Sequence, residues 1–359
     1  MTRTPALLKP YKVCEISMDG CRSFCVPGGC EGATAGFCRG CNDCDFGDPQ
    51  GKCPNGGCDK CWVRCWRRNN HAEWMEDIGG LDFNTETCVL PFMGDLPGCI
   101  PQIRDNVWDI YHPAYIVPIR KMMNLKNRRL VFRKNGLRHH WHIPAESKLI
   151  VSFCARDDIL EDIWSRQNQA WDDEGRNFWE VLSDYGFDAA ISLDFSCFGN
   201  YPRMEHLICM KRNIMTASKL AAAGIPVILD IMTYCDEDYD RFLAWGKDQG
   251  IAWYNLNYQM TKKVPWVLEL IYDKCDKLFA AVPNAKVIIT GIGDAERIGI
   301  LLNKYPGRIS VSTSNVLMHS QYKRVYSVTD HVWIKQAVTP EEAFRRNLEI
   351  FNRAAEIGK

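Results

Sequence analysis

The stretch Gly224-Ile225-Pro226-Val227-Ile228-Leu229-Asp230 decides the fold, because it has the form of a buried strand that follows a turn and ends on a carboxylate. A continuous apolar run of this kind is typical of a strand that is covered on both faces in a parallel sheet. Working outward from it, similar runs recur between residues 86 and 315. They predict strands at 88–93, 114–119, 149–154, 189–195, 226–232, 252–258, 287–292 and 309–313.

Amphipathic helical patterns separate the later strands, at 159–185, 204–223, 237–249, 264–282 and 295–304. Strands that alternate with helices predict a parallel α/β sheet of βαβ units, which is either open and doubly wound or closed. Eight strands favour the (β/α)8, TIM-like barrel. We therefore expect a Cys-rich metal-binding region at 1–85 and a (β/α)8-type barrel with a C-terminal helix at 86–359.

Eleven of the eighteen cysteines lie between Cys14 and Cys65. This segment is too rich in glycine and charge to form its own core, so it needs disulfides or metal in order to fold. The absence of an apolar leader and of an 18-residue apolar run predicts a cytoplasmic protein that does not enter the membrane. Thiols stay reduced there, which favours metal. The expected metal ligands are Cys21, Cys25, Cys30, Cys38, Cys41, Cys44, Cys53, Cys58, Cys61 and Cys65.

The spacing of these cysteines leaves two metals open. Cys38, Cys41 and Cys44 form a C-x2-C-x2-C run. Cys53 precedes a proline, as the fourth cysteine of the ferredoxin pattern does. However, eight residues separate Cys53 from Cys44, whereas three do so in that pattern. Thiolate sets also hold structural zinc. We expect an iron–sulfur cluster of the 4Fe-4S type or zinc, in a catalytic or a purely stabilising role.

In a (β/α)8 barrel, the chemistry takes place where strands end and βα loops begin. Asp194 and Asp230 lie in otherwise apolar strands, and a buried carboxylate is costly unless it is paired or used in catalysis. Two such groups on adjacent strands can divide acid and base roles, or they can accept backbone N–H bonds and cap loops. The predicted catalytic and substrate-positioning residues are Asp194, Asp230, Ser196, Asn257 and Thr313.

Two further segments predict contacts with phosphate. Gly291-Ile292-Gly293-Asp294 follows a strand and opens a helix, as a phosphate-binding turn does, so Gly291 and Gly293 are expected to bind a cofactor or substrate. In residues 126–142, cationic side chains alternate with aromatic ones. This pattern is typical of segments that bind nucleic acid, and it is also found in hairpins whose charged face is exposed to solvent. The cations expected to bind nucleic acid are Arg128, Arg129, Arg133, Lys134 and Arg138. A formal net charge of zero argues against coating of nucleic acid by bulk charge.

The region from about 189 to 292 resembles a family of uncharacterised phage and mobile-element proteins. The resemblance lies in Asp194-Phe195-Ser196, Pro202, Lys211-Arg212 and Gly224-Ile225-Pro226-Val227-Ile228, and it implies no known activity. A looser similarity is to barrels of the tRNA-guanine transglycosylase type, including those that insert deazaguanine into DNA. That similarity implies paired aspartates at the barrel mouth and zinc bound by cysteines. The zinc ligands of those barrels follow the barrel, whereas the cysteines here precede it.

Three functions are compatible with this sequence. The first is a metal-bearing, transferase-like barrel enzyme that modifies or exchanges a nucleotide or nucleic acid base, with Asp194 and Asp230 as acid, base or nucleophile. The second is a non-catalytic, zinc-stabilised nucleic-acid-binding protein of a phage or mobile element. The third is an iron–sulfur enzyme that reduces a small molecule or transfers sulfur to it.

Overall fold

The computed structural model describes residues 71–87, 89–124, 129–132, 136–197, 203–233, 235–260 and 264–357. All ten cysteines predicted to bind metal precede these residues, and Arg128, Arg133 and Lys134 also lie outside them. The chain divides into two compact units. The larger one, called the barrel unit below, comprises Cys88–Asp194, Ala217–Ile231 and Gly246–Lys359.

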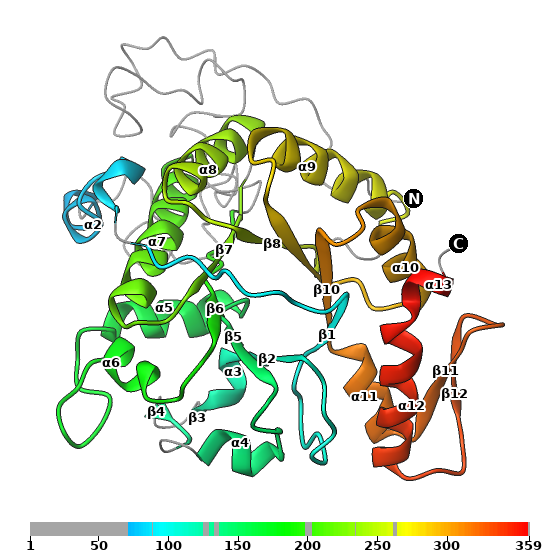
Figure 1. Cartoon of the computed structure of the whole chain (residues 1–359). Coiled ribbons are helices and arrows are strands. Elements are labelled where there is room, and N and C mark those ends of the chain that lie inside the picture. The colour runs from blue at the N-terminus through cyan, green and yellow to red at the C-terminus, as the bar shows by residue number, and fades with distance from the viewer. Residues whose placement is uncertain are drawn as a thin grey trace, which may run out of the picture. The chain divides into compact units, whose positions relative to one another are not determined.

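Eight parallel strands of the barrel unit follow one another around a ring (Figure 1). Each pairs in parallel with the next, and a bridge from Gln102 to Ile116 joins the first to the second. The protein therefore has an α/β fold with a nearly closed, TIM-like barrel. The strands are β1 (Cys99–Pro101), β2 (Ala114–Pro118), β5 (Lys148–Ser152), β6 (Ala189–Ile191), β7 (Val227–Asp230), β8 (Trp253–Asn257), β9 (Lys286–Thr290) and β10 (Ile309–Thr313).

The first predicted strand was wrong, whereas the other seven overlap strands of the barrel. In the described part of 88–93, the segment makes only an isolated bridge between Pro91 and Val227. The true first strand, β1, is only three residues long, and it ends in a proline. Such a short run carries little periodic signal, which is why the sequence pattern did not reveal it.

Residues 89–98 instead cover the amino-terminal end of the barrel. The backbone N–H of Phe92 donates to the carbonyl of Val227 at the start of β7, and the ring of Phe92 joins the apolar cluster inside the barrel. Lys148 at the start of β5 donates to the backbone carbonyl of Asp95 (2.7 Å), and Lys286 at the start of β9 pairs with its carboxylate (2.5 Å). The carboxyl ends of the strands are thus left for a binding site.

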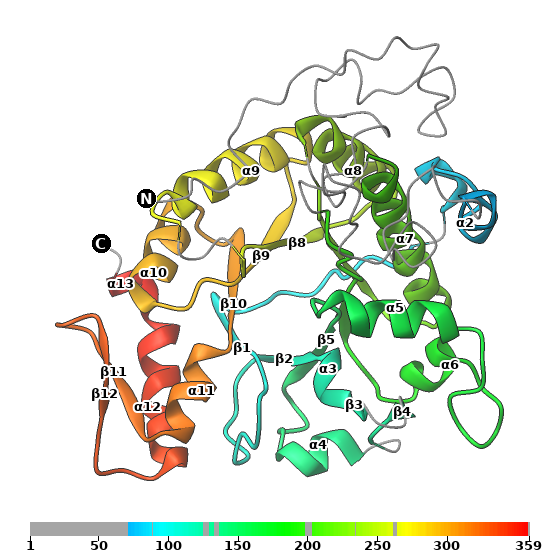
Figure 2. The same ribbon diagram turned by 180° about the vertical axis from the view of Figure 1, so that it is seen from behind.

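Helices alternate with the strands along the barrel unit (Figure 2). The pattern at 159–185 gives two helices rather than one, because Asn177 caps a new helix with bonds from the N–H groups of Trp179 and Glu180. The helices are α3 (Ile119–Met122), α4 (Gly136–Trp141), α5 (Asp157–Arg166), α6 (Phe178–Ser183), α9 (Val267–Ala281), α10 (Ala295–Lys304), α11 (Asn315–Gln321), α12 (Pro340–Asn352) and α13 (Ala354–Ile357). Two hairpins add β3 (Met123–Asn124), β4 (Arg129–Leu130), β11 (Arg324–Ser327) and β12 (Val332–Lys335).

The smaller unit combines described residues before Cys88 with Phe195–Thr216 and Met232–Trp245. Within it, Lys211 is fully buried, donates to the backbone carbonyl of Asp82 (2.7 Å) and pairs with Glu86 (3.2 Å). Arg212 is also buried, and its guanidinium packs against the ring of Phe195. Both cations of the Lys211-Arg212 pair are therefore part of the packed interior of this unit. The helical elements are α2 (His71–Asp77), η3 (Phe83–Thr85) and much of α7 (Arg203–Ala222) and α8 (Asp236–Asp248).

Candidate active site

Two aspartates lie buried at the carboxyl ends of adjacent strands. Asp230 is the last residue of β7 and is 0% exposed, and Asp194, which follows β6, is 4% exposed. Asn257 donates to Asp194 Oδ2 (2.6 Å), and the amide of Asn255 donates to Asp230 Oδ1. Apart from contacts of the two carboxyl groups with each other and with Cys154, Asp194 Oδ1 and Asp230 Oδ2 have no hydrogen-bond partner among the described residues. The structure thus places these two strand-end carboxylates next to each other.

Burial dominates the protonation of this pair. It raises the pKa of Asp194 to about 6, against the lowering effect of the hydrogen bond from Asn257. Burial also raises the pKa of Asp230 well above its ordinary value, and the negative charge of Asp194 raises it further. Two carboxylates in one dry site cannot both ionise cheaply. The two carboxyl groups therefore titrate as a unit, and burial favours the state in which the pair holds a proton.

A chain of hydrogen bonds orients the amide that contacts Asp230. Thr290 Oγ1 at the end of β9 donates to Asn255 Oδ1 (2.8 Å), so the amide nitrogen of Asn255 is turned toward Asp230. The backbone N–H of Asp230 in turn donates to Ser192 Oγ (2.9 Å). The backbone of Asp230 is thus held from one side and its carboxyl group from the other, which suits a group whose position must be fixed for chemistry.

Cys154 completes this cluster, although the sequence pattern did not single it out. Its Sγ lies 3.8 Å from Asp230 Oδ1 and accepts a hydrogen bond from the amide of Asn255. One ligand atom each from Cys154, Asp194 and Asp230 lies within 4.8 Å of the other two, so this group could hold a metal ion. The available signal was its position, two residues after the end of β5, where barrel chemistry is concentrated.

The remaining predicted residues lie elsewhere. Ser196 belongs to the smaller unit. The Oγ1 atom of Thr313 accepts a hydrogen bond from the backbone N–H of Asn315 (3.1 Å). Arg138 donates to the carbonyls of Pro144 and Ser147, so its guanidinium is bound within the fold. The other described cation of that segment, Arg129, lies 3.5 Å from an exposed aspartate.

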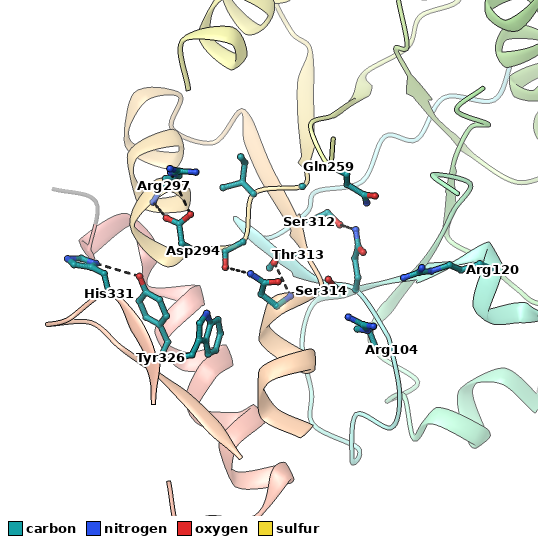
Figure 3. A pocket seen from close by; sticks show the side chains of 16 residues that line it. Arg104, Arg120, Gln259, Asp294, Arg297, Ser312, Thr313, Ser314, Tyr326 and His331 are labelled. Atoms are coloured by element: carbon teal, nitrogen blue, oxygen red, sulfur yellow. Dashed lines mark hydrogen bonds and ion pairs between the residues drawn. The ribbon is translucent and has the colours of Figure 1, made fainter. Parts of the chain in front are cut away.

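A cavity of about 480 Å³ opens at the carboxyl ends of β1, β8, β9 and β10 (Figure 3). The predicted phosphate turn, with Gly291 and Gly293, lines it together with Thr313. Figure 3 shows Arg104 and Arg120 on one side of Ser312 and Thr313, and Asp294 with Arg297 on the other. Because β8 and β9 also carry Asn255, Asn257 and Thr290, the cavity and the aspartate cluster share strands of one barrel end.

Comparison with known proteins assigns no family. No known protein-family profile matches the sequence, and no characterised protein matches it significantly. A glycerol uptake operon antiterminator-related protein from Thermotoga maritima is similar at 14% identity and a TM-score of 0.34, over 61% of this chain and 95% of that one. A 4-hydroxy-2-oxoglutarate aldolase is similar at 13% identity and a TM-score of 0.37, over 78% of this chain and 100% of that one. A mandelate oxidase with an FMN adduct is similar at 11% identity and a TM-score of 0.38, over 77% of this chain and 79% of that one. These are distant structural similarities to TIM-barrel proteins of diverse function.

Among the described residues, no helix is both long and apolar enough to cross a membrane.

Proposed function

We propose that the barrel is a transferase-like enzyme that performs acid–base chemistry on a nucleotide or nucleobase. The observation that carries the proposal is the buried pair of Asp194 and Asp230, each with one oxygen that receives no hydrogen bond from described residues outside the pair and Cys154. An uncompensated buried carboxylate is costly, and carboxylates with strongly shifted pKa values gather at catalytic sites. Their place at the carboxyl ends of barrel strands supports the same conclusion.

The environment of each aspartate assigns its role. Asp230 is fully buried and next to the charge of Asp194, so it holds the shared proton and acts as the general acid. Asp194 receives a hydrogen bond from Asn257, which favours its ionised form, so it acts as the general base. A nucleobase offers a hydrogen-bond donor and an acceptor side by side, which matches one ionised and one protonated carboxyl group.

The experiment is a screen of nucleosides and nucleotides for base exchange or modification, followed by mass spectrometry of the products. We expect Asp194→Asn and Asp230→Asn each to reduce turnover by roughly 10²–10⁴-fold, the usual contribution of a general acid or base. Asp273→Asn is the matched control, since this exposed carboxylate on α9 pairs with Lys277 at 3.8 Å. Full turnover by Asp194→Asn on every substrate that the wild type converts would overturn the proposal.

We further propose that the cysteines between Cys21 and Cys65 bind an iron–sulfur cluster or zinc. The support is their spacing alone, because they lie outside the described residues. Metal and acid-labile sulfide analysis of protein purified without oxygen tests it: sulfide with iron identifies a cluster, and stoichiometric zinc without sulfide identifies a zinc site. Protein that holds neither would contradict the proposal.

A further inference from the structure

Two arginines give the cavity a positive side. Arg104 follows β1 and is half-buried, and Arg120 lies in α3. In the described part of the chain, neither guanidinium has a carboxylate partner. Lys121 lies close to both: its pKa is lowered first by burial and then by the charges of Arg104 and Arg120. The charge of the exposed Asp105 opposes this effect on Lys121, but three cations still outnumber the one carboxylate, and such a cluster favours an anionic ligand.

The acidic residue of the cavity does not neutralise this side. Asp294 caps α10 by accepting a hydrogen bond from the backbone N–H of Arg297 (2.8 Å), and its carboxylate also pairs with the guanidinium of Arg297 at 3.7 Å. Its charge is therefore used locally, on the side of the cavity opposite Arg104 and Arg120 in Figure 3. The charge that is left over in the cavity is positive.

The loop after β9 brings bare backbone to the cavity wall. Gly291 has φ +110°, and a Cβ there would lie 2.5 Å from the backbone nitrogen of Gln259. A Cβ on Gly293 would lie 2.1 Å from Asn315 Nδ2, which donates to the carbonyl of Gly293 (2.9 Å). The backbone N–H groups of Ile292 and Gly293 have no acceptor among the described residues. Buried backbone donors without an acceptor are rare in proteins, and successive N–H groups at a cavity wall suit an oxyanion.

We propose that this cavity is a phosphate subsite that binds the phosphoryl group of a small phosphomonoester through Arg104, Arg120 and the loop Gly291–Gly293. Two guanidinium groups and backbone N–H groups offer donors from several directions, which fits a tetrahedral, doubly charged oxyanion better than a flat, singly charged carboxylate. The volume of about 480 Å³ exceeds that of a phosphate ion, so the rest of the substrate also has room. The identification of this substrate as a nucleoside phosphate rests on the proposed function.

The test measures binding of inorganic phosphate to the full chain by calorimetry at low ionic strength, in wild type and in the double variant Arg104→Gln/Arg120→Gln. Neither side chain is part of the buried core, and Arg104→Lys/Arg120→Lys provides a second variant that keeps the charge. We expect the glutamine variant to bind phosphate at least about tenfold more weakly, the scale of one lost charge-assisted hydrogen bond, and the lysine variant to lose less. The charge-matched control is Arg345→Gln/Arg353→Gln, two exposed arginines that pair with glutamates near the C-terminus.

Equal phosphate affinity in wild type and in the glutamine variant, or an equal loss in the control, would overturn the subsite. A nucleoside 5′-monophosphate should bind at least tenfold more tightly than its nucleoside, again only in wild type. Asp194→Asn separates the two proposals. If this variant binds phosphate and keeps full turnover, the phosphate subsite is supported and the acid–base function is overturned. If the variant loses turnover but the wild type does not bind phosphate, the acid–base function is supported and the phosphate subsite is overturned.

Discussion

Asn257 Nδ2 donates a 2.6 Å hydrogen bond to Asp194 Oδ2, from the end of β8 to the end of β6, two strands away in the ring. Between these strands lies β7, which ends on Asp230. This bond favours the ionised form of Asp194, whereas burial opposes it. The pair thus has two environments, one that supports a charge and one that does not, and this asymmetry is the basis of the proposed division into base and acid.

Removal of that bond should shift the pH dependence of activity. In Asn257→Ala the ionised Asp194 loses a donor, so its pKa should rise and the acidic limb of the pH–rate profile should move to higher pH. The measurement is turnover per enzyme against pH for both proteins. An unshifted acidic limb, with turnover reduced equally at every pH, would mean that Asn257 only places the substrate.

The pH dependence of stability should also report the buried carboxyl. The folded pKa of Asp194, about 6, lies above the ordinary value of 3.8, so the folded state binds the extra proton between these values. This group therefore contributes its full stability below the unfolded pKa, and the contribution is lost as the pH rises through the folded pKa. We expect Asp194→Asn to be more stable relative to wild type at pH 8 than at pH 4, by on the order of 2 kcal/mol. Urea unfolding at both values tests this, and an equal difference at both would contradict it.

The segment that covers the amino-terminal end should matter for stability and not for chemistry. Phe92 is 5% exposed and packs in the apolar cluster inside the barrel, so Phe92→Ala should cost about 3–5 kcal/mol of unfolding free energy. The neighbouring Met93 is 75% exposed, and Met93→Ala should change little. Turnover per folded molecule should be unchanged in both. A large loss of turnover in folded Phe92→Ala would place this end of the barrel in the functional machinery.

The glycine of the phosphate loop should not tolerate a side chain. In Gly293→Ala the new Cβ would meet Asn315 Nδ2 at 2.1 Å, so the asparagine must move and phosphate should bind more weakly. Adding Asn315→Ala removes the obstructing amide and should restore part of the affinity. Gly136→Ala is the control, because a Cβ at this position meets nothing within 4 Å. Wild-type phosphate affinity in Gly293→Ala would contradict the assigned geometry.

Zinc should compete with the shared proton. Because ligand atoms of Cys154, Asp194 and Asp230 lie within 4.8 Å of one another, added Zn²⁺ should bind there, displace protons and inhibit turnover. We expect Cys154→Ser to need at least about tenfold more zinc for half-inhibition, because even the loss of a group that only orients a ligand weakens metal binding by about that factor. Cys275→Ser, at a buried thiol in α9, should behave as wild type. Identical zinc sensitivity in all three proteins would show that zinc inhibits elsewhere.

The sequence predicted the barrel because its strands are apolar runs such as 226–232, which keep their character in any parallel sheet. It placed Asp194 and Asp230 together for the same reason, since adjacent parallel strands end at one edge. It missed Cys154 because a thiol at a strand end has the composition of a core residue, and only the fold shows the two carboxylates beside it. It also missed Arg104 and Arg120, because the cavity they line depends on β1, a strand too short to be recognised.

The protonation state of the aspartate pair at neutral pH tests the central claim most directly. Infrared difference spectra of the carboxyl region, recorded for wild type, Asp194→Asn and Asp230→Asn, report whether a protonated carboxyl is present. The structure predicts one protonated carboxyl in wild type, which disappears on deprotonation at high pH and whose band changes in both variants. A wild type in which both aspartates are ionised at neutral pH would contradict the account.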